Sequence, residues 1–439
     1  MLDAIENAPT LSLLVITAWQ LARVLAVKLV EETLARRAQA ATEWGKCERC
    51  GQRLQSKGFK SRQIKSVIGV IHWQRRLGRC PNKCAIGQVA PLDEALGLTA
   101  HQKSDSCLQR VACLVAIFVP FETAALLVQQ LTGITISSQA VWQWVQAAGQ
   151  RMMQQLEAEL ADLAAGTEPE GEAMSAEIAA QALLMGADGV MVPFRPQEKT
   201  AKGPTKWREV KVAILARLGH LRTREGNLSP RLQRHRVAAV LGDIDDLSER
   251  MWLEALKQGV KTAPRVVWLS DGARGFWRLF EERFQEYATG VLDFYHAAQN
   301  LWSGIKVWLD GRTKQCQTWF TEARHRLRHD QADAVLADIK AALELEGLPD
   351  SAEQALTKLY NYLHKHRDHI QYEKLKEMGL PIGSGLVEST CKWLIQQRFK
   401  GVGMRWSEAG FNHLLHLRLS WVNGRFDTFF PDSIPSPKS

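Results

Sequence analysis

Cysteine is scarce in this chain, and long uncharged hydrophobic runs are missing. Eight cysteines in 439 residues are too few for a disulfide scaffold. The most apolar window, Leu11–Val30, is interrupted by Gln20, Arg23 and Lys28, which are costly in hydrocarbon. We therefore predict a soluble helix that runs to about Ala41 and is either buried or used for self-association, and we expect no membrane span.

The N-terminus also lacks the features of a secretory signal peptide. Asp3 and Glu6 stand where a basic leader would be, and no small-residue cleavage site is evident. We therefore expect a cytoplasmic protein whose thiols stay reduced, so that its cysteines bind metal or fill the core. The sequence has no internal repeat, and its 46% hydrophobic and 23% charged residues exclude a mainly disordered or fibrous chain.

The net charge of +9 is concentrated in two segments. Residues 44–84 hold eleven basic side chains and one acidic side chain, and residues 195–236 hold twelve basic and three acidic ones. The remainder of the chain is net acidic. Two basic segments on an otherwise acidic chain favour a nucleic-acid partner over a merely solvated surface.

Four cysteines bracket the first basic segment with the spacing of zinc ligands. Cys47 and Cys50 precede two short β-like runs parted by Gly69, and Cys80 and Cys84 follow them. Each pair supplies two thiolates, and four thiolates satisfy tetrahedral Zn²⁺. We therefore predict a structural zinc ribbon at residues 44–90. The other cysteines, which lack metal spacing and are expected in the core, are Cys107, Cys113, Cys316 and Cys391.

The pattern becomes helical after the ribbon. Residues 121–131 and 139–150 are typical of two helices, joined by a turn at Gly133 and an N-cap at Ser137 or Ser138. A helix, a glycine turn and a capped helix suit a helix-turn-helix, although many helical hairpins share this pattern. We predict a helical DNA-binding region over residues 91–165, after an N-terminal helix at 1–43.

After the helical region, the spacing of apolar residues becomes that of strands and helices in an α/β domain. An acidic segment with glycine and proline, residues 166–181, predicts a linker. Strand-like runs follow at 182–192, 207–218, 237–241, 265–270 and 291–293, with helical patterns at 247–258 and 276–287. This order predicts a mixed α/β sheet over 182–300. We further expect an all-helical stretch at 301–380, a helical region after a glycine-rich entry at 381–425, and a tail at 426–439 that is frayed from Pro431.

Three acids stand where the predicted sheet would bring them together. Asp188 lies inside an apolar strand, Asp271 ends another, and Glu388 falls in the first turn of a late helix. Converging carboxylates repel each other, and Mg²⁺ relieves the repulsion. Taken one at a time, each acid has a simple structural explanation: a β-bulge for Asp188, a turn for Asp271, and an acidic residue favoured by the helix dipole for Glu388. Their joint placement instead suits two-metal phosphoryl transfer.

The order of these motifs resembles the DDE transposases of bacterial insertion sequences, in particular the ISKra type, which is related to Mutator-like elements. The resemblance extends from Ala182 to about Leu419. The motifs that carry it are Gly186-Ala-Asp188-Gly-Val190, Trp207-x-Glu209-x-Lys211, Ser270-Asp271-Gly-Ala273, Asp293-Phe-Tyr-His296-Ala297, Gly383-Ser-Gly-Leu-Val-Glu388-Ser389 and Gly403-Met-Arg-Trp-Ser407.

The resemblance implies a ribonuclease-H-like fold with an all-α insertion before the catalytic helix. It also implies Asp188, Asp271 and Glu388 as the ligands of Mg²⁺ or Mn²⁺. Asp293 and His296 match the Asp-x-x-His signature of Mutator-like enzymes. Asp293 competes with Glu388 as the third ligand, and we favour Glu388 because the family pattern and the glycine-rich approach point to it. His296 either orients a phosphate or carboxylate or is a structural histidine.

The resemblance and the charge pattern together predict a nucleoid-associated transposase. It would bind the terminal inverted repeats of its element as double-stranded DNA, cut their 3′ ends and join them to target DNA, as a homo-oligomer with at least two copies. The predicted DNA-contacting residues are Lys392, Arg398, Lys400 and Arg405, with Trp393 and Trp406 as base-stacking or core side chains, and Arg75 and Arg76 in the ribbon. Two alternatives stay open: a domesticated DNA-binding regulator without catalysis, and a ribonuclease-H-like nuclease or resolvase.

Overall fold

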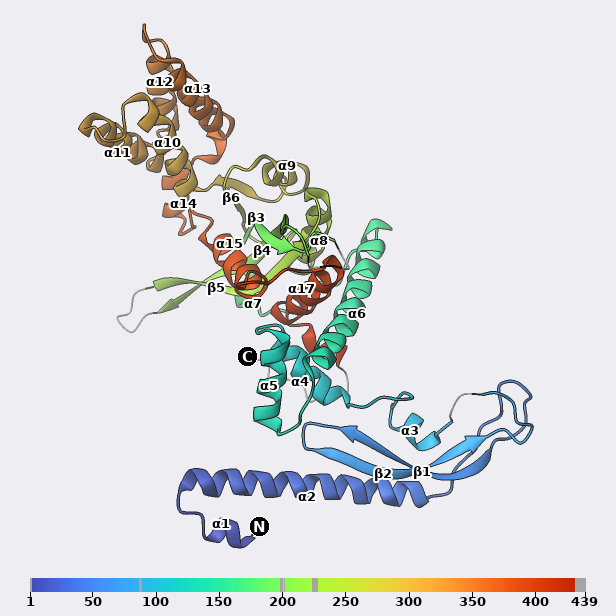
Figure 1. The fold of residues 1–439 in the computed structure, drawn as a ribbon. Coiled ribbons are helices and arrows are strands. Elements are labelled where there is room, and N and C mark those ends of the chain that lie inside the picture. The colour runs from blue at the N-terminus through green and yellow to red at the C-terminus, as the bar shows by residue number, and fades with distance from the viewer. Residues whose placement is uncertain (1, 87–88, 198–199, 201, 223–227, 431–439) are drawn as a thin grey trace. The chain divides into compact units, whose positions relative to one another are not determined.

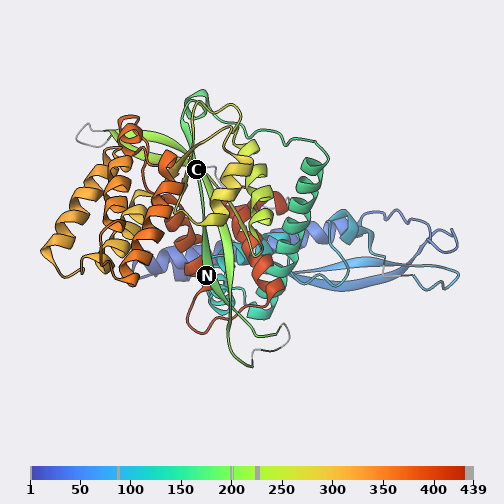
Figure 2. The same cartoon turned by 90° about the horizontal axis from the view of Figure 1, so that it is seen from above.

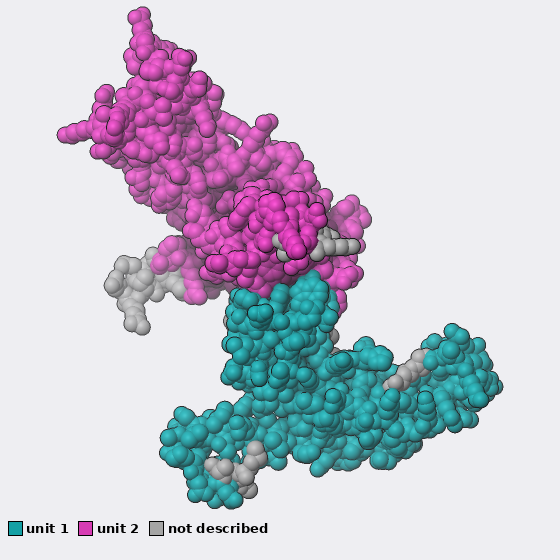
Figure 3. Space-filling view, viewed as in Figure 1, with its two compact units in different colours: residues 1–147, 427–439 teal, residues 148–426 magenta. Residues whose placement is uncertain are grey.

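The chain divides into two compact units in the computed structural model, which describes residues 2–86, 89–197, 200, 202–222 and 228–430. Unit 1 comprises residues 1–147 and 427–439, and unit 2 comprises residues 148–426 (Figure 3). The division falls inside helix α6 (Ser138–Ala164) and not at the predicted acidic linker. Helix α6 is longer than predicted because its second half consists mostly of strong helix formers, alanine, glutamine, leucine and glutamate.

Unit 1 begins with the short helix α1 (Leu2–Glu6) and the long helix α2 (Leu11–Gln39). The Thr10 hydroxyl caps α2 by accepting a hydrogen bond from the Leu13 N–H. The helix ends close to the predicted Ala41. By length and composition alone α2 could cross a membrane, and it is the one such helix among the residues that the structure describes.

Helix α2 lies along an antiparallel hairpin of β1 (Gln55–Lys65) and β2 (Val70–Arg79) (Figure 1). The contact buries Leu34 of α2 against Ile64, Ile71 and Trp73 of the hairpin. Of the two predicted β-like runs, residues 64–70 and 72–77, the second lies within β2. The first contains the hairpin turn, where the Ser66 N–H donates to the Gly69 carbonyl at 2.8 Å. The hairpin is therefore longer on both sides than the apolar runs indicated.

The rest of unit 1 is helical. Its elements are α3 (Pro91–Ala95), α4 (Ser106–Ala116), α5 (Phe121–Thr132) and the first part of α6. Gly133 ends α5 in the left-handed conformation at φ +70°, and the Ser137 hydroxyl caps α6 by accepting from the Ala140 N–H at 3.1 Å. The predicted glycine turn and serine cap between these two helices are thus confirmed.

Unit 2 is built on one mixed sheet of five strands (Figure 1). The strands are β3 (Ala182–Phe194), β4 (Lys206–Arg222), β5 (Leu228–Val240), β6 (Val266–Ser270) and β7 (Thr289–Leu292). Their order is β5-β4-β3-β6-β7; β3, β4 and β5 are antiparallel neighbours, whereas β6 runs parallel to β3 and β7 to β6. The predicted mixed α/β sheet is confirmed. The edge strand β5 starts earlier than predicted because arginines interrupt its apolar pattern.

Helices cover and extend this sheet. The helices that precede, separate or follow these strands along the chain are α7 (Ala176–Ala179), α8 (Ile244–Lys257), α9 (Arg274–Arg283) and α10 (Phe294–Trp308). A bundle beside the sheet adds α11 (Lys314–Arg328), α12 (Ala332–Leu343), α13 (Asp350–Lys365), the 3₁₀ turn η1 (Arg367–His369) and α14 (Tyr372–Glu377) (Figure 2). The chain then forms α15 (Gly385–Thr390), the π-helical segment η2 (Cys391–Gln396), α16 (Gln397–Phe399) and α17 (Glu408–Val422).

Two segments that were predicted to be irregular make specific contacts in the structure. The acidic segment at 166–181 is irregular up to Ser175 and lies within unit 2, where the Glu172 carboxylate forms ion pairs with Arg236 and Arg425. The predicted tail at 426–439 begins with the 3₁₀ turn η3 (Phe426–Phe429), and the side chain of Phe426 is buried. The remainder of that tail, residues 431–439, lies outside the described residues.

Candidate active site and metal centre

The pairing of β3 with β6 places two of the predicted metal ligands, Asp188 and Asp271, beside each other. Gly186 of β3 pairs with Leu269 of β6 in parallel register, so two residues further on Asp188 stands level with Asp271. Adjacent strands lie about 4.8 Å apart, and residues of equal register point to the same face. Asp188 and Asp271 therefore share one face at the carboxyl end of β6, and both are half-buried.

Helix α15 carries the third predicted ligand, Glu388, to β3. A Cβ atom on Gly186 would stand 2.5 Å from the Leu269 carbonyl oxygen and 2.6 Å from Cγ2 of Val387. Glycine is therefore required at this position for the residue before Glu388 to pack against the strand. The helix continues into the π-helical η2, a form that is frequent at functional sites. Lys392 approaches the Glu388 carboxylate at 3.8 Å.

The three acids influence one another electrostatically. Burial raises the pKa of Asp188, and the negative charges of Asp271 and Glu388 raise it further, whereas a hydrogen bond from the Gly189 N–H lowers it. One oxygen of Asp271 accepts a hydrogen bond from the Ala273 N–H at 2.9 Å. The set is thus an open, mutually repelling group of oxygen ligands, which is the chemistry that a divalent cation such as Mg²⁺ complements.

Asp293 occupies a different position from the three acids. It follows β7 at the level of Asp271, and the residue is 1% exposed. One carboxylate oxygen accepts from the His296 N–H at 2.8 Å and lies 3.4 Å from His296 Nδ1; the other accepts from both the N–H and the hydroxyl of Ser384. Both oxygens are engaged by the protein. Asp293 therefore fits a brace between β7, α10 and the entry to α15 better than a metal ligand.

The titration of the Asp293–His296 pair follows from these contacts. Burial of Asp293 opposes its ionisation, but the hydrogen bonds from His296 and Ser384 outweigh burial and lower the pKa of its carboxyl to about 2. The hydrogen bond to Asp293 raises the pKa of His296, and the charges of Asp271 and Glu388 add to this effect. His296 is only half-buried and faces the electrostatic field of the three acids, so it can present a proton or a positive charge there.

Two residues of the site were missed by sequence reasoning. Ser384 binds Asp293, and its place in the glycine-rich entry to α15 was a usable signal. Tyr362 comes from α13 in the helical bundle and donates its hydroxyl to the Asp271 main-chain carbonyl at 3.2 Å. Nothing local in the sequence links Tyr362 to Asp271, because the contact spans 91 residues.

The four ribbon cysteines converge in unit 1. The Sγ atoms of Cys47, Cys50, Cys80 and Cys84 all lie within 4.8 Å of one another, and this is the one such group of three or more metal-ligating side chains among the described residues. The Sγ atoms of Cys50 and Cys80 are 3.4 Å apart. Tetrahedral Zn–S bonds of 2.3 Å would separate sulfur atoms by about 3.8 Å. The cluster can therefore bind a metal such as Zn²⁺, whereas the ligand atoms of the three acids are more widely spaced.

Two of the predicted DNA-contacting residues are buried. Arg75 is 5% exposed, and its Nε donates to Asp93 at 2.9 Å. Arg398 is 2% exposed, with its guanidinium 5.3 Å from the centre of the Trp406 ring. Their predicted contacts with phosphates are wrong for this structure, because both side chains are buried by packing that the sequence pattern does not reveal.

The other predicted DNA-contacting residues are more accessible. Lys392 and Lys400 are exposed; Nζ of Lys400 lies 5.6 Å from the centre of the Trp207 ring, and that indole is 55% exposed. Arg405 is half-buried and donates to the Gly203 carbonyl at 2.8 Å. In the ribbon hairpin, the guanidinium of Arg76 lies 5.1 Å from the ring centre of the exposed Phe59. Each unit thus offers a basic side chain beside an exposed aromatic ring.

The two tryptophans of the last helical region contribute to the core. Trp406 is half-buried, donates its indole N–H to the Phe399 carbonyl at 2.9 Å and contacts the rings of Phe399 and Phe411. Trp393 is half-buried beneath the guanidinium of Arg418. The structure thus favours the core role over the base-stacking role for both.

The second basic segment is partly neutralised within unit 2. Arg217 is 1% exposed and donates to main-chain carbonyls, including that of Gln181 at 2.9 Å. Arg234 and Arg236 form ion pairs with Glu172. The charge count over residues 195–236 therefore overstates the positive charge that this segment presents to a partner.

Comparison with known proteins places this chain within a described family. A UPF0236 protein encoded in the vanSb 3′ region of Streptococcus gallolyticus is 24% identical over 385 residues, which is 86% of this chain and 76% of that protein. The Drosophila P element transposase strand transfer complex matches 76% of this chain and 83% of its own chain at 10% identity, with a TM-score of 0.25. A TM-score this low does not establish a shared fold. The model of the uncharacterised protein family UPF0236 matches residues 5–427, and the chain therefore belongs to that family.

Proposed function

We propose that this protein is a DDE transposase that binds the ends of its insertion sequence and catalyses metal-dependent strand cleavage and strand transfer. The observation that carries the proposal is the level placement of Asp188 and Asp271 on neighbouring parallel strands, with Glu388 close enough to raise the pKa of Asp188. The mixed sheet followed by a helical bundle suits a ribonuclease-H-like core with an all-α insertion.

The three acids would hold the metal ions. Mg²⁺ or Mn²⁺ bound there would lower the pKa of an attacking water or 3′-hydroxyl and stabilise the leaving 3′-oxygen. Asp188 and Asp271 fix two ligand positions through the sheet, and Glu388 supplies the third from a helix whose entry is held by Ser384 and Asp293. His296, whose pKa is raised by Asp293, would orient a phosphate beside the acids.

DNA would be bound by both units. Zn²⁺ on the four cysteines would hold the hairpin that displays Arg76, and the turn between α5 and α6 belongs to the predicted helix-turn-helix. Lys392, Lys400 and Arg405 of unit 2 would contact phosphates near the acids, and the exposed Trp207 beside Lys400 would stack on an unpaired base. The substrates would be the terminal inverted repeats and target DNA in the bacterial nucleoid, and bringing two ends together would require at least two copies.

The test is strand cleavage and joining on the DNA that flanks the gene, with Mg²⁺, comparing wild type with Asp271→Asn. End-specific products that require Mg²⁺ and disappear in the variant are the expected result. Specific binding without cleavage by the wild type would favour the regulator. Cleavage of branched DNA without any requirement for the flanking ends would favour the nuclease or resolvase.

A further inference from the structure

Helix α2 exposes apolar side chains on more than one side of its first half, among them Leu13, Ile16 and Trp19, and one continuous row of apolar residues extends beyond that half. Leu11, Val15, Leu25 and Leu29 are exposed by 76%, 57%, 54% and 65%. Together with Ala18 and Ala22 they form a series whose spacing alternates between four and three residues, which is the seam of a coiled coil. We name these six residues the outer stripe. At 1.5 Å per residue the outer stripe is roughly 27 Å long.

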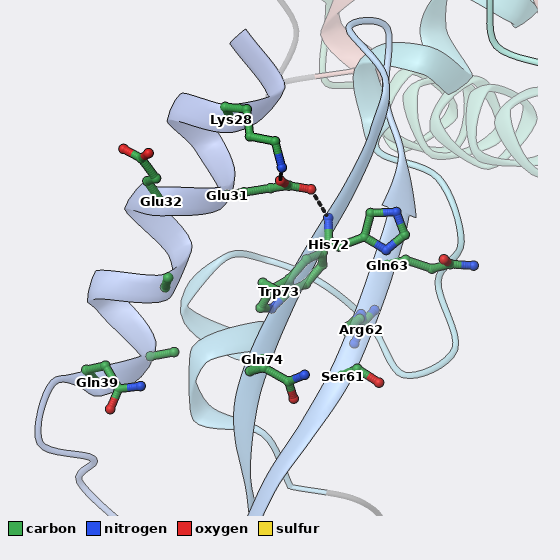
Figure 4. Close-up of a pocket in the computed structure, with 12 residues that line it drawn as sticks. Lys28, Glu31, Glu32, Gln39, Ser61, Arg62, Gln63, His72, Trp73 and Gln74 are labelled. Carbon is green, nitrogen blue, oxygen red and sulfur yellow. Dashed lines mark hydrogen bonds and ion pairs between the residues drawn. The ribbon is translucent and has the colours of Figure 1, made fainter. Parts of the chain in front are cut away.

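The opposite face of α2 is bound to the β1–β2 hairpin. The Arg23 Nε donates to the Ile68 carbonyl of the hairpin turn at 3.3 Å. The Glu31 carboxylate accepts from Lys28 Nζ of α2 at 2.9 Å and from the His72 N–H of the hairpin at 3.0 Å (Figure 4). A helix that crossed a membrane would carry Arg23 and Glu31 with it into the hydrocarbon and lose these contacts. The outer stripe therefore needs a partner that covers one face of the helix and leaves the other on the hairpin.

We propose that the outer stripe pairs with the outer stripe of a second copy, with the two α2 helices antiparallel. The stripe is self-complementary about its midpoint. A two-fold axis there sets Leu11 against Leu29 of the second copy, Val15 against Leu25, and Ala18 against Ala22. Small residues at the centre let the helices approach closely, and the larger side chains seal both ends. The short helix α1 lies beside the start of α2 and leaves Leu11 and Val15 exposed.

Charge selects the antiparallel orientation. The spacing of the outer stripe continues into Glu32 and Arg36. A parallel pair would set Glu32 against Glu32 and Arg36 against Arg36, and like charges in contact are unfavourable. An antiparallel pair places these charges beyond Leu11 of the other helix. The acidic Glu32 at the end of the stripe is also unsuited to an anionic lipid surface, which attracts helices rich in lysine and arginine.

This inference specifies the self-association that the proposed transposase needs, and it rests on the proposed function only for that purpose. The test is sedimentation of the full-length, zinc-loaded protein over a range of micromolar concentrations. Wild type is expected to form a dimer, and Leu25→Glu is expected to weaken it at least tenfold. Val24→Glu is the matched control, because Val24 is exposed by 46% but lies off the outer stripe.

A charge exchange then tests the orientation. Val15→Lys alone should also weaken the dimer, whereas Val15→Lys combined with Leu25→Glu should restore it, since each lysine then faces a glutamate of the other copy. A parallel pair would stay dissociated in the double variant, which would overturn the antiparallel arrangement. Circular dichroism and zinc content of every variant should match wild type, so that unfolding is not mistaken for dissociation.

Two further results would overturn the pairing of stripes. One is a wild-type protein that stays monomeric, or a Leu25→Glu variant that dimerises as strongly as wild type. The other is a monomer that floats with vesicles of phosphatidylcholine and phosphatidylglycerol and loses this binding in Leu25→Glu, which would assign the stripe to lipid. The Asp271→Asn protein should dimerise like wild type, so a failure of the catalytic proposal leaves this test intact.

Discussion

The two proposed sets of metal ligands, the four cysteines and the three acids, are assembled in opposite ways. The four cysteines of unit 1 come from two short pairs at the base of one hairpin, and their sulfur atoms already lie within 4.8 Å of one another. The three acids of unit 2 come from β3, from the end of β6 and from α15, and they are spread over 200 residues of sequence.

This difference separates a closed site from an open one. Four thiolates around one ion fill its coordination sphere, so such a cluster holds a fold together. In the proposed active site, the half-exposed carboxylates would leave positions on a bound metal for water and substrate. The acids depend on the whole sheet and on the Asp293–Ser384 brace, so their geometry is sensitive to distant residues.

The largest expected effect is the loss of the closed site. Wild type should contain a stoichiometric amount of zinc and Cys80→Ser none, as measured by plasma mass spectrometry. The effect is the largest because structural zinc contributes roughly 10 kcal/mol of apparent binding free energy. Unfolding of unit 2 should be unchanged. Cys107→Ser, which lies outside the cluster, is the matched control. Unaltered zinc content in Cys80→Ser would refute the zinc ribbon.

The open site should show a conflict between stability and activity. Asp188→Asn should lower cleavage by about 1000-fold or more, roughly 4 kcal/mol of barrier. The same change should raise the melting temperature without Mg²⁺, because burial and neighbouring charges raise the pKa of Asp188 and make its ionised form unfavourable in the folded state. Thermal unfolding measures this, with Glu346→Gln, which removes an exposed carboxylate between α12 and α13, as the control. A lower melting temperature in Asp188→Asn would contradict the repulsion.

The brace should contribute stability that depends on pH. The pKa of Asp293 is lowered to about 2, so its contribution is present above the ordinary pKa near 4 and is lost as the pH falls toward 2. Asp293→Asn should therefore destabilise the protein by roughly 2 kcal/mol at pH 7 and by progressively less below pH 4. Urea unfolding across this range measures the difference. A difference that does not depend on pH would show that hydrogen-bond geometry, and not charge, is what Asp293 supplies.

The smallest expected effect is on DNA affinity. Lys400→Ala should weaken binding about two- to fivefold and reduce the salt dependence by about one phosphate contact. Fluorescence anisotropy at several salt concentrations measures both quantities. Lys358→Ala, an exposed lysine of the helical bundle, should leave affinity unchanged. Equal losses in the two variants would indicate non-specific attraction to net charge.

Local patterns predicted the parts of the fold that depend on short-range sequence. The apolar runs of β3 and β6 gave the mixed sheet, and the two cysteine pairs gave the converging thiols. The cap at Ser137 and the turn at Gly133 were likewise visible, because capping chemistry acts within a few residues.

Long-range pairing could not be predicted. Arg75 and Arg398 look like any other basic residue in the sequence, and only the fold shows that both are buried, with Arg75 bound to Asp93 and the guanidinium of Arg398 over the Trp406 ring. The Glu172 network removes charge from both the acidic segment and the second basic segment for the same reason. Asp293 matched a ligand by its position after a strand, and its role as a brace depends on Ser384, which lies 91 residues away.

The most direct test of the central claim compares the two acids that compete for the third ligand position. Mg²⁺-dependent cleavage of paired element ends should be measured for wild type, Glu388→Gln and Asp293→Asn at a temperature where all three are folded, together with their affinity for the same DNA. We expect Glu388→Gln to bind DNA and lose cleavage, and Asp293→Asn to keep measurable cleavage. Normal cleavage by Glu388→Gln, or complete loss only in Asp293→Asn, would contradict the account.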